Sequence, residues 1–131
     1  MASTTTVRPR PDDIIDSLTK ILSSVEGEVV FLTCVDQHGY VGDSEAYASK
    51  DQPKSSLPLE HLFSFPHEQG IDTVMVTSRA SESLESIAES DIEFTTALLD
   101  AAETEGIEVL DHVLVKDGEH RSLRALTDLW I

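Results

Sequence analysis

The sequence has a single cysteine, Cys34, within the apolar stretch FLTCVD. One cysteine excludes an internal disulfide and is typical of a protein from a reducing cytoplasm, which is the location we expect. The apolar neighbours predict that Cys34 is a small buried hydrophobic residue and not a nucleophile. Redox and thiol chemistry are therefore not indicated.

Long apolar runs are also missing. No stretch approaches the roughly 20 apolar residues of a membrane-spanning helix. The start of the chain, MASTTTVRPRP, lacks the hydrophobic region of a signal peptide. Its small polar residues, arginines and prolines predict a disordered tail at residues 1–10, followed by one domain at 11–131. We expect no membrane partner.

Basic residues are scarce, with 9 Lys+Arg against 25 Asp+Glu and a formal net charge of −16. The negative electrostatic field of such a chain repels nucleic-acid phosphates and anionic lipid headgroups, which excludes both as general partners. The acidity fits either a patch for a basic partner or adaptation to molar salt, which screens self-repulsion. Because the acids are spread from Asp12 to Asp128, we favour a salt-adapted, halophilic source.

Several chemical signatures are absent as well. The sequence contains no phosphate-binding loop, dinucleotide fingerprint, Ser-His-Asp order or zinc-finger spacing. At 131 residues, 40% of them hydrophobic, the chain is long enough to bury a core without disulfides or a structural metal. The composition indicates an ordinary globular domain.

Hydrophobic spacing predicts an α/β fold. We expect one helix to end at Gly27 and another at Gly106, and we expect Pro66 to shorten the helix between them. In the best-marked helix, Ser90 to Glu93 forms a capping box. Its predicted buried face carries Ile92, Thr95, Leu99 and Ala102. We expect a mixed sheet flanked by helices, with helices at 11–27, 57–69, 90–105 and within 122–131, and strands at 28–36, 40–49, 72–77 and 107–115.

Two stretches together resemble a known family. SDIEFTTALLDAAETEGIEVLDHVLV is similar to the C-terminal half of the RadC-like domain, within the JAB/MPN metalloprotease superfamily. EVVFLTCVDQHGYV resembles the opening strand of that family, with Glu28, Phe31 and Asp36 in the matching positions. The resemblance covers about residues 28–123 and implies an MPN-like, cytidine-deaminase-like sheet.

The resemblance also implies a metal motif, in which His-x-His is followed by a spacer and then by Asp. In this chain the spacer corresponds to residues 81–90. In the family, two imidazoles and a carboxylate hold zinc, and a nearby glutamate deprotonates the zinc-bound water. By this alignment Asp91 and Glu28 are retained, whereas Ser78 and Ala80 stand in the two histidine positions. A serine hydroxyl is a poor zinc ligand and an alanine is none. We therefore expect no metal and no cofactor.

These substitutions predict a pseudoenzyme that acts as a binding or scaffold module. The alternative is a metal-dependent, isopeptidase-like hydrolase with an atypical site built from Glu28, Asp91, His112 and a histidine brought close by folding. We expect His112 to be a hydrogen-bonded structural residue. The remaining histidines lack ligand spacing and are predicted to be exposed: His38, His61, His67 and His120.

A second alternative is a small-anion sensor centred on Arg79. Ser78, Arg79 and Ser81 precede the 90–105 helix, whose N-terminal N–H groups favour anions. However, Glu82, Glu85 and Glu89 lie in the same loop, so a surface Arg–Glu pair is the simpler interpretation.

Metal-free MPN relatives commonly serve as assembly partners. The resemblance thus implies a protein partner or self-association. The apolar C-terminal residues either form a docking face or close the core: Leu126, Leu129, Trp130 and Ile131.

Overall fold

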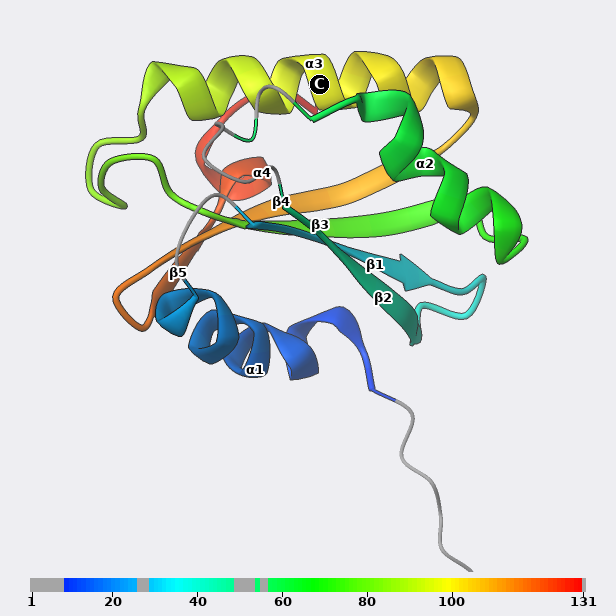
Figure 1. The fold of residues 1–131 in the computed structure, drawn as a ribbon, viewed down its shortest axis with the longest axis horizontal. Coiled ribbons are helices and arrows are strands. Elements are labelled where there is room, and N and C mark those ends of the chain that lie inside the picture. Colours follow the sequence, from blue (N-terminus) through cyan, green and yellow to red (C-terminus); the bar gives the residue numbers. More distant parts are fainter. Residues whose placement is uncertain (1–8, 26–28, 49–53, 55–56, 131) are drawn as a thin grey trace, which may run out of the picture.

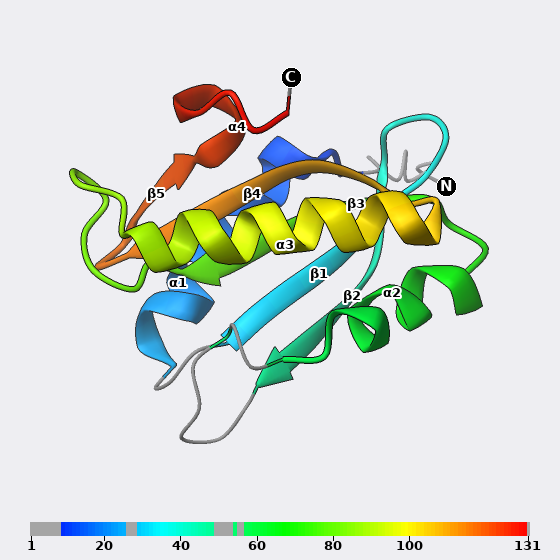
Figure 2. The same ribbon diagram turned by 90° about the horizontal axis from the view of Figure 1, so that it is seen from above.

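The computed structural model describes residues 9–25, 29–48, 54 and 57–130. Within them lies a five-stranded sheet with the strand order β2-β1-β3-β4-β5. The pair β3 and β4 is parallel, and the other neighbouring strands are antiparallel, so the sheet is mixed as predicted (Figure 2). The strands are β1 Val29–Val35, β2 Val41–Ala48, β3 Thr73–Arg79, β4 Glu108–Lys116 and β5 Glu119–Ser122.

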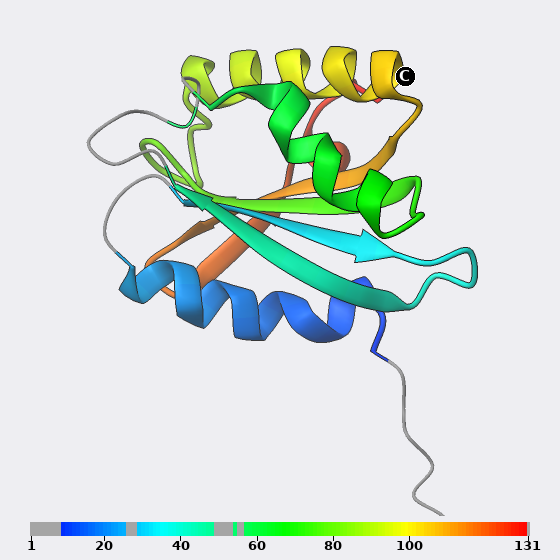
Figure 3. The same ribbon diagram turned by 45° about the vertical axis from the view of Figure 1, so that its right-hand side comes forward.

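Helices cover both faces of the sheet. The helices are α1 Pro11–Ser24, α2 Leu59–Glu68, α3 Glu89–Glu105 and α4 Leu123–Leu126. The helices α2 and α3 lie on one face and α1 on the other, which gives three layers (Figures 1 and 3). No helix in the described part of the chain combines the length and apolarity needed to cross a bilayer.

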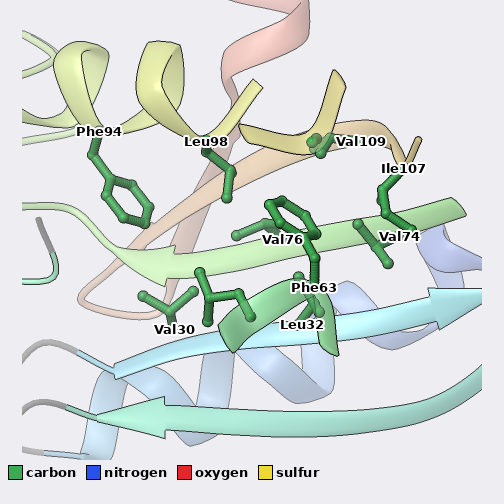
Figure 4. Packing of buried hydrophobic residues seen from close by; sticks show 11 residues of the cluster. Val30, Leu32, Phe63, Val74, Val76, Phe94, Leu98, Ile107 and Val109 are labelled. Carbon is green, nitrogen blue, oxygen red and sulfur yellow. The ribbon is translucent and has the colours of Figure 1, made fainter. Parts of the chain in front are cut away.

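Strand alternation sorts the core into two parts. Side chains of Val74 and Val76 pack toward α2 and α3, where Phe63 and Leu98 contribute to the larger cluster (Figure 4). Met75, between them in sequence, packs with α1 on the opposite face. Because successive strand residues point to opposite faces, Ser78 is directed toward α3 and Arg79 toward α1.

A bulge in β4 changes which residues face α3. The register pairs Val74 with Val109 but Val76 with His112, so β4 has one extra residue in between. Val109 joins the α3-side cluster, and after the bulge Val113 packs with α1. His112 therefore faces α3, as Val109 does, despite its even number.

The predicted elements are largely confirmed, with small differences at their ends. The Gln37–Gly39 turn is held by Asp36, whose carboxylate accepts from the N–H groups of His38 and Tyr40. The α2 helix continues past Pro66 to Glu68, so the expectation that proline would shorten it is wrong. Proline removes the donor to the carbonyl oxygen of Leu62, and the Tyr47 hydroxyl approaches that oxygen at 3.5 Å.

The start and the buried face of α3 differ from the prediction. The helix begins at Glu89 with Ala88 as N-cap and no side-chain capping bond, so the Ser90 capping box does not form. Its buried residues are Asp91, Phe94, Thr95, Leu98 and Ala102. The buried stripe is rotated relative to the predicted one because Asp91 points inward. Gly106 ends the helix with φ of 69°, as predicted.

The C-terminal segment closes the core. The Trp130 indole N–H donates to the Val109 carbonyl oxygen at 2.7 Å, and its ring packs against two buried clusters. Leu126 is 47% exposed. Some predicted features lie at least in part outside the described residues: the tail at 1–10, Gly27, Glu28, the end of the strand at 40–49, and Ile131. The predicted boundaries of the tail and domain stay predictions.

Candidate functional site

Ser78 and Asp91, two of the residues that the predicted motif alignment singles out, meet at the C-terminal end of β3. Ser78 is the second-last residue of β3, and Asp91 is the third residue of α3. The N-terminal end of α3 lies over that strand end (Figure 1). The Ser81 N–H donates to Asp91 Oδ2 at 2.9 Å, and the Ser81 hydroxyl donates to Asp91 Oδ1 at 2.7 Å. Folding thus brings Ser78, Ser81 and Asp91 together.

A lysine that the sequence interpretation overlooked lies at the centre of this group. The Lys54 Nζ atom is 2.6 Å from Asp91 Oδ1. It also donates to Ser78 Oγ at 3.1 Å and to the Arg79 carbonyl oxygen at 2.9 Å. Each of the three ammonium hydrogens therefore has an acceptor. The ammonium also lies 5.7 Å from the centre of the Phe94 ring, within cation–π range.

The charged pair is removed from solvent. Lys54 is 2% exposed, and Asp91 and Ser78 are fully buried. Separating two charges from water is costly, and the cost is repaid only by close pairing with the remaining donors and acceptors satisfied. That condition is met here, since both Asp91 oxygens and the Lys54 ammonium have partners.

His112 extends the polar network to a second residue of α3, Thr95. Its Nε2 atom lies 2.6 Å from Ser78 Oγ, and its Nδ1 atom lies 2.7 Å from Thr95 Oγ1. The Phe94 ring meets the imidazole edge-on, with centroids 5.7 Å apart. As predicted, His112 is a buried, hydrogen-bonded structural residue.

The directions of these hydrogen bonds fix the imidazole tautomer. Thr95 donates its hydroxyl hydrogen to the Asp91 carbonyl oxygen at 2.7 Å, so it accepts from His112 Nδ1–H. Ser78 accepts from Lys54 and is free to donate to His112 Nε2. This single arrangement satisfies the side-chain polar groups of the hydrogen-bonded series that runs from Lys54 through Ser78 and His112 to Thr95.

Electrostatics agree with that assignment. Burial, followed by the Lys54 ammonium, lowers the pKa of His112 to about 3, so the imidazole is neutral near pH 7. Burial alone would raise the pKa of Asp91, but the Lys54 ammonium and the Ser81 hydrogen bonds lower it below its ordinary value. The site holds one anion and one cation, and its formal charge is zero.

Arg79 does not join this network through its side chain. Its guanidinium Nη1 donates to the Val25 carbonyl oxygen at the end of α1, at 2.7 Å. The three residues predicted to form an anion site are thus divided: Ser78 and Ser81 bind within the Lys54–Asp91 network, and Arg79 caps α1 on the opposite face. Anion binding stays a prediction.

The remaining candidate nucleophile and histidines lie outside this network. Cys34 is buried, and burial followed by the charge of Asp43 raises the pKa of its thiol to about 11, so it is a poor nucleophile. The exposed histidines are those predicted: His38, His61, His67 and His120.

The residues of the motif do not fit a zinc ion. Ala80 supplies no donor atom and packs with Leu114 and Leu123. The Ser78 hydroxyl is already bonded to Lys54 and His112, and both imidazole nitrogens of His112 are used. Among the described residues, no group of three or more His, Cys, Asp or Glu side chains is placed to hold a metal ion. Glu28 lies outside that part of the chain.

The mixed five-stranded sheet flanked by helices agrees with a domain of the JAB class. A family model described as the RadC-like JAB domain matches residues 9–128. This chain therefore belongs to the RadC-like JAB domain family, and the predicted resemblance is confirmed.

Curated relatives carry the name UPF0758 protein. One from Gloeothece citriformis is 46% identical over 44 residues, which is 34% of this chain and 18% of that protein. One from Nostoc is 41% identical over 58 residues, covering 44% of this chain and 24% of that protein. The matches thus span about a quarter or less of the relatives' lengths.

Two members of the network differ in how readily the sequence reveals them. Thr95 lies four residues after Asp91 on the same helix face, so the 3.6-residue period can place the two together. Lys54 sits in the polar stretch KDQPKSS, without any periodic pattern. Its partners are 24 to 37 residues away in sequence, and only the scarcity of lysine draws attention to it.

Proposed function

We propose that this chain is a non-catalytic member of the RadC-like JAB family, a binding or scaffold module in the cytoplasm of a salt-adapted organism. The observation that carries the proposal is the Lys54 ammonium at 2.6 Å from Asp91 Oδ1. Asp91 is the carboxylate that the family motif assigns to the metal, and here its charge is already neutralised by the protein itself.

The chemistry of this pair supports a site that cannot activate water. A catalytic zinc site keeps a coordination position open for water and lowers the pKa of that water. The ammonium has no such position, because its three hydrogens point to Asp91, Ser78 and the Arg79 carbonyl. A divalent cation brought to Asp91 would also be repelled by Lys54 at short range.

Zinc analysis tests the absence of catalysis. Protein purified in high salt without a histidine tag is expected to contain substoichiometric zinc. The isosteric variant Asp91→Asn should contain no less than the wild type. One zinc per wild-type chain, lost in Asp91→Asn, would overturn the proposal and favour a hydrolase with an atypical site.

A protein partner or self-association follows from the family resemblance. The described residues include two exposed large apolar side chains, Ile21 of α1 at 45% and Leu126 of α4 at 47%, which are separate candidate contact points for such a partner. The edge strand β2 carries Asp43 and Glu45, whose charges oppose pairing of two copies through that edge. Sedimentation over a range of salt concentrations measures self-association. If the protein is a monomer at every salt concentration, self-association is excluded and the expected partner is a different protein.

A further inference from the structure

The polar network at the strand end contains an internal cation, and we propose that Lys54 takes the structural place of the metal ion in this domain. Its ammonium neutralises Asp91 and joins α3 to the end of β3. The proposal concerns how the site is held together, and it deepens the proposed function by giving the physical reason why the metal is dispensable.

The contacts of the ammonium are those of a linking cation. It binds the side chain of Asp91 on α3 and the hydroxyl of Ser78 on β3. It also binds the backbone oxygen of Arg79, the last residue of β3. A cation in this position therefore holds the consecutive elements β3 and α3 together, and it comes from a segment that lies well before both in the sequence.

Charge also favours this interpretation. Asp91 is fully buried, and burial of an unpaired carboxylate is strongly unfavourable. The other neighbouring side chains are the neutral groups of Ser78, Ser81 and His112. One positive charge is enough to balance the site, whereas a divalent ion would leave an excess positive charge in a buried space.

A double-mutant cycle tests the assignment. Lys54→Met keeps much of the side-chain length but leaves Asp91 unpaired, and we expect the melting temperature to fall by about 10–20 °C. Asp91→Asn leaves the ammonium unpaired and should lower it comparably. The double variant should lose less than Lys54→Met alone, because no uncompensated charge remains.

The matched control is Lys20→Met, at an exposed position of α1. It should change the melting temperature by no more than about 2 °C. An unchanged melting temperature in Lys54→Met, or losses that simply add in the double variant, would overturn the assignment.

Chemical rescue gives a second readout. Lys54→Ala removes the equivalent of a propylammonium ion, so added propylammonium should raise the melting temperature of that variant. Neutral 1-propanol should not, and Lys54→Ala/Asp91→Asn should respond to neither compound. Equal effects of the two compounds would contradict a role for the charge.

The two proposals fail in different measurements. Zero coupling between Lys54 and Asp91 in protein that lacks zinc would end the cation assignment and leave the non-catalytic function standing. Stoichiometric zinc dependent on Asp91 would end the non-catalytic function, whatever the variants do to stability.

Discussion

The two halves of α3 pack against the same sheet in opposite ways. Near its start, Asp91 and Thr95 face the Lys54–His112 network. Near its end, Leu98 and Ala102 face the apolar cluster that includes Phe63 (Figure 4). Apolar packing is non-directional and tolerates swaps that conserve volume. The polar half depends on complete pairing, since one missing partner leaves a buried charge or a buried unpaired group.

The largest expected effect compares one residue from each half. Asp91→Ala should lower the free energy of unfolding by about 3–5 kcal/mol, because the Lys54 ammonium stays buried without a counterion. Leu98→Ala should lower it by about 2–5 kcal/mol through lost burial and a cavity. Denaturant unfolding at one fixed salt concentration measures both values.

The control for that pair is Glu93→Ala on the exposed side of α3, with a change within about 0.5 kcal/mol. A small effect of Asp91→Ala beside a large effect of Leu98→Ala would show that the polar half contributes little to stability.

A second expected difference is the response to pH. The folded pKa of His112 is about 3, below the unfolded value, so its contribution to stability is complete above about pH 6.5. As the pH falls from 6.5 toward 3, the unfolded chain binds one more proton at this residue, and stability decreases by about 1.4 kcal/mol per pH unit.

His112→Asn removes this titration and should flatten the dependence between pH 5.0 and 6.5 by about that slope. This window lies above the ordinary carboxyl pKa values. Asp91, with its lowered pKa, loses its contribution only at lower pH. Leu98→Ala should keep the wild-type slope, and equal slopes in wild type and His112→Asn would contradict a buried neutral imidazole.

The smallest expected effect concerns Arg79, outside the network. Arg79→Ala loses the bond to the Val25 carbonyl oxygen and should lower stability by about 1 kcal/mol. Inorganic phosphate should shift the melting temperature of wild type and variant equally. Stabilisation of the wild type alone, about 2.7 kcal/mol at a hundredfold excess over Kd, would establish the anion-sensor alternative.

Local sequence patterns predicted most of the helices and strands of the fold. The apolar spacing of α1 and the β-branched runs of β1, β3 and β4 carry their own periodicity, and the tight turns follow from residues such as Gly39 and Gly106. The errors arose where tertiary contacts override local preference. The predicted buried face of the 90–105 helix did not include Asp91, yet this residue points into the core and rotates the buried stripe of α3. Likewise, the α2 helix tolerates Pro66.

The candidate site was predicted only in part. Ser78, Ala80 and Asp91 came from the spacing of the family motif, and the structure places Ser78 and Asp91 around one ammonium. The bulge that turns His112 toward α3 left no recognisable mark in the alternation of β4. No local sequence pattern identifies Lys54 as the partner of Asp91, because an ion pair across a long sequence separation depends on neither secondary-structure propensity nor hydrophobic periodicity.

By itself, the sequence determined the class of fold, the family and the acidic charge, because each is a matter of local pattern or composition. The tertiary structure alone decided which side chain pairs with Asp91. A buried carboxylate that stays ionised needs a nearby cation, and which cation reaches it depends on how distant segments pack. Lys54 could therefore be assigned to Asp91 only after the chain was folded.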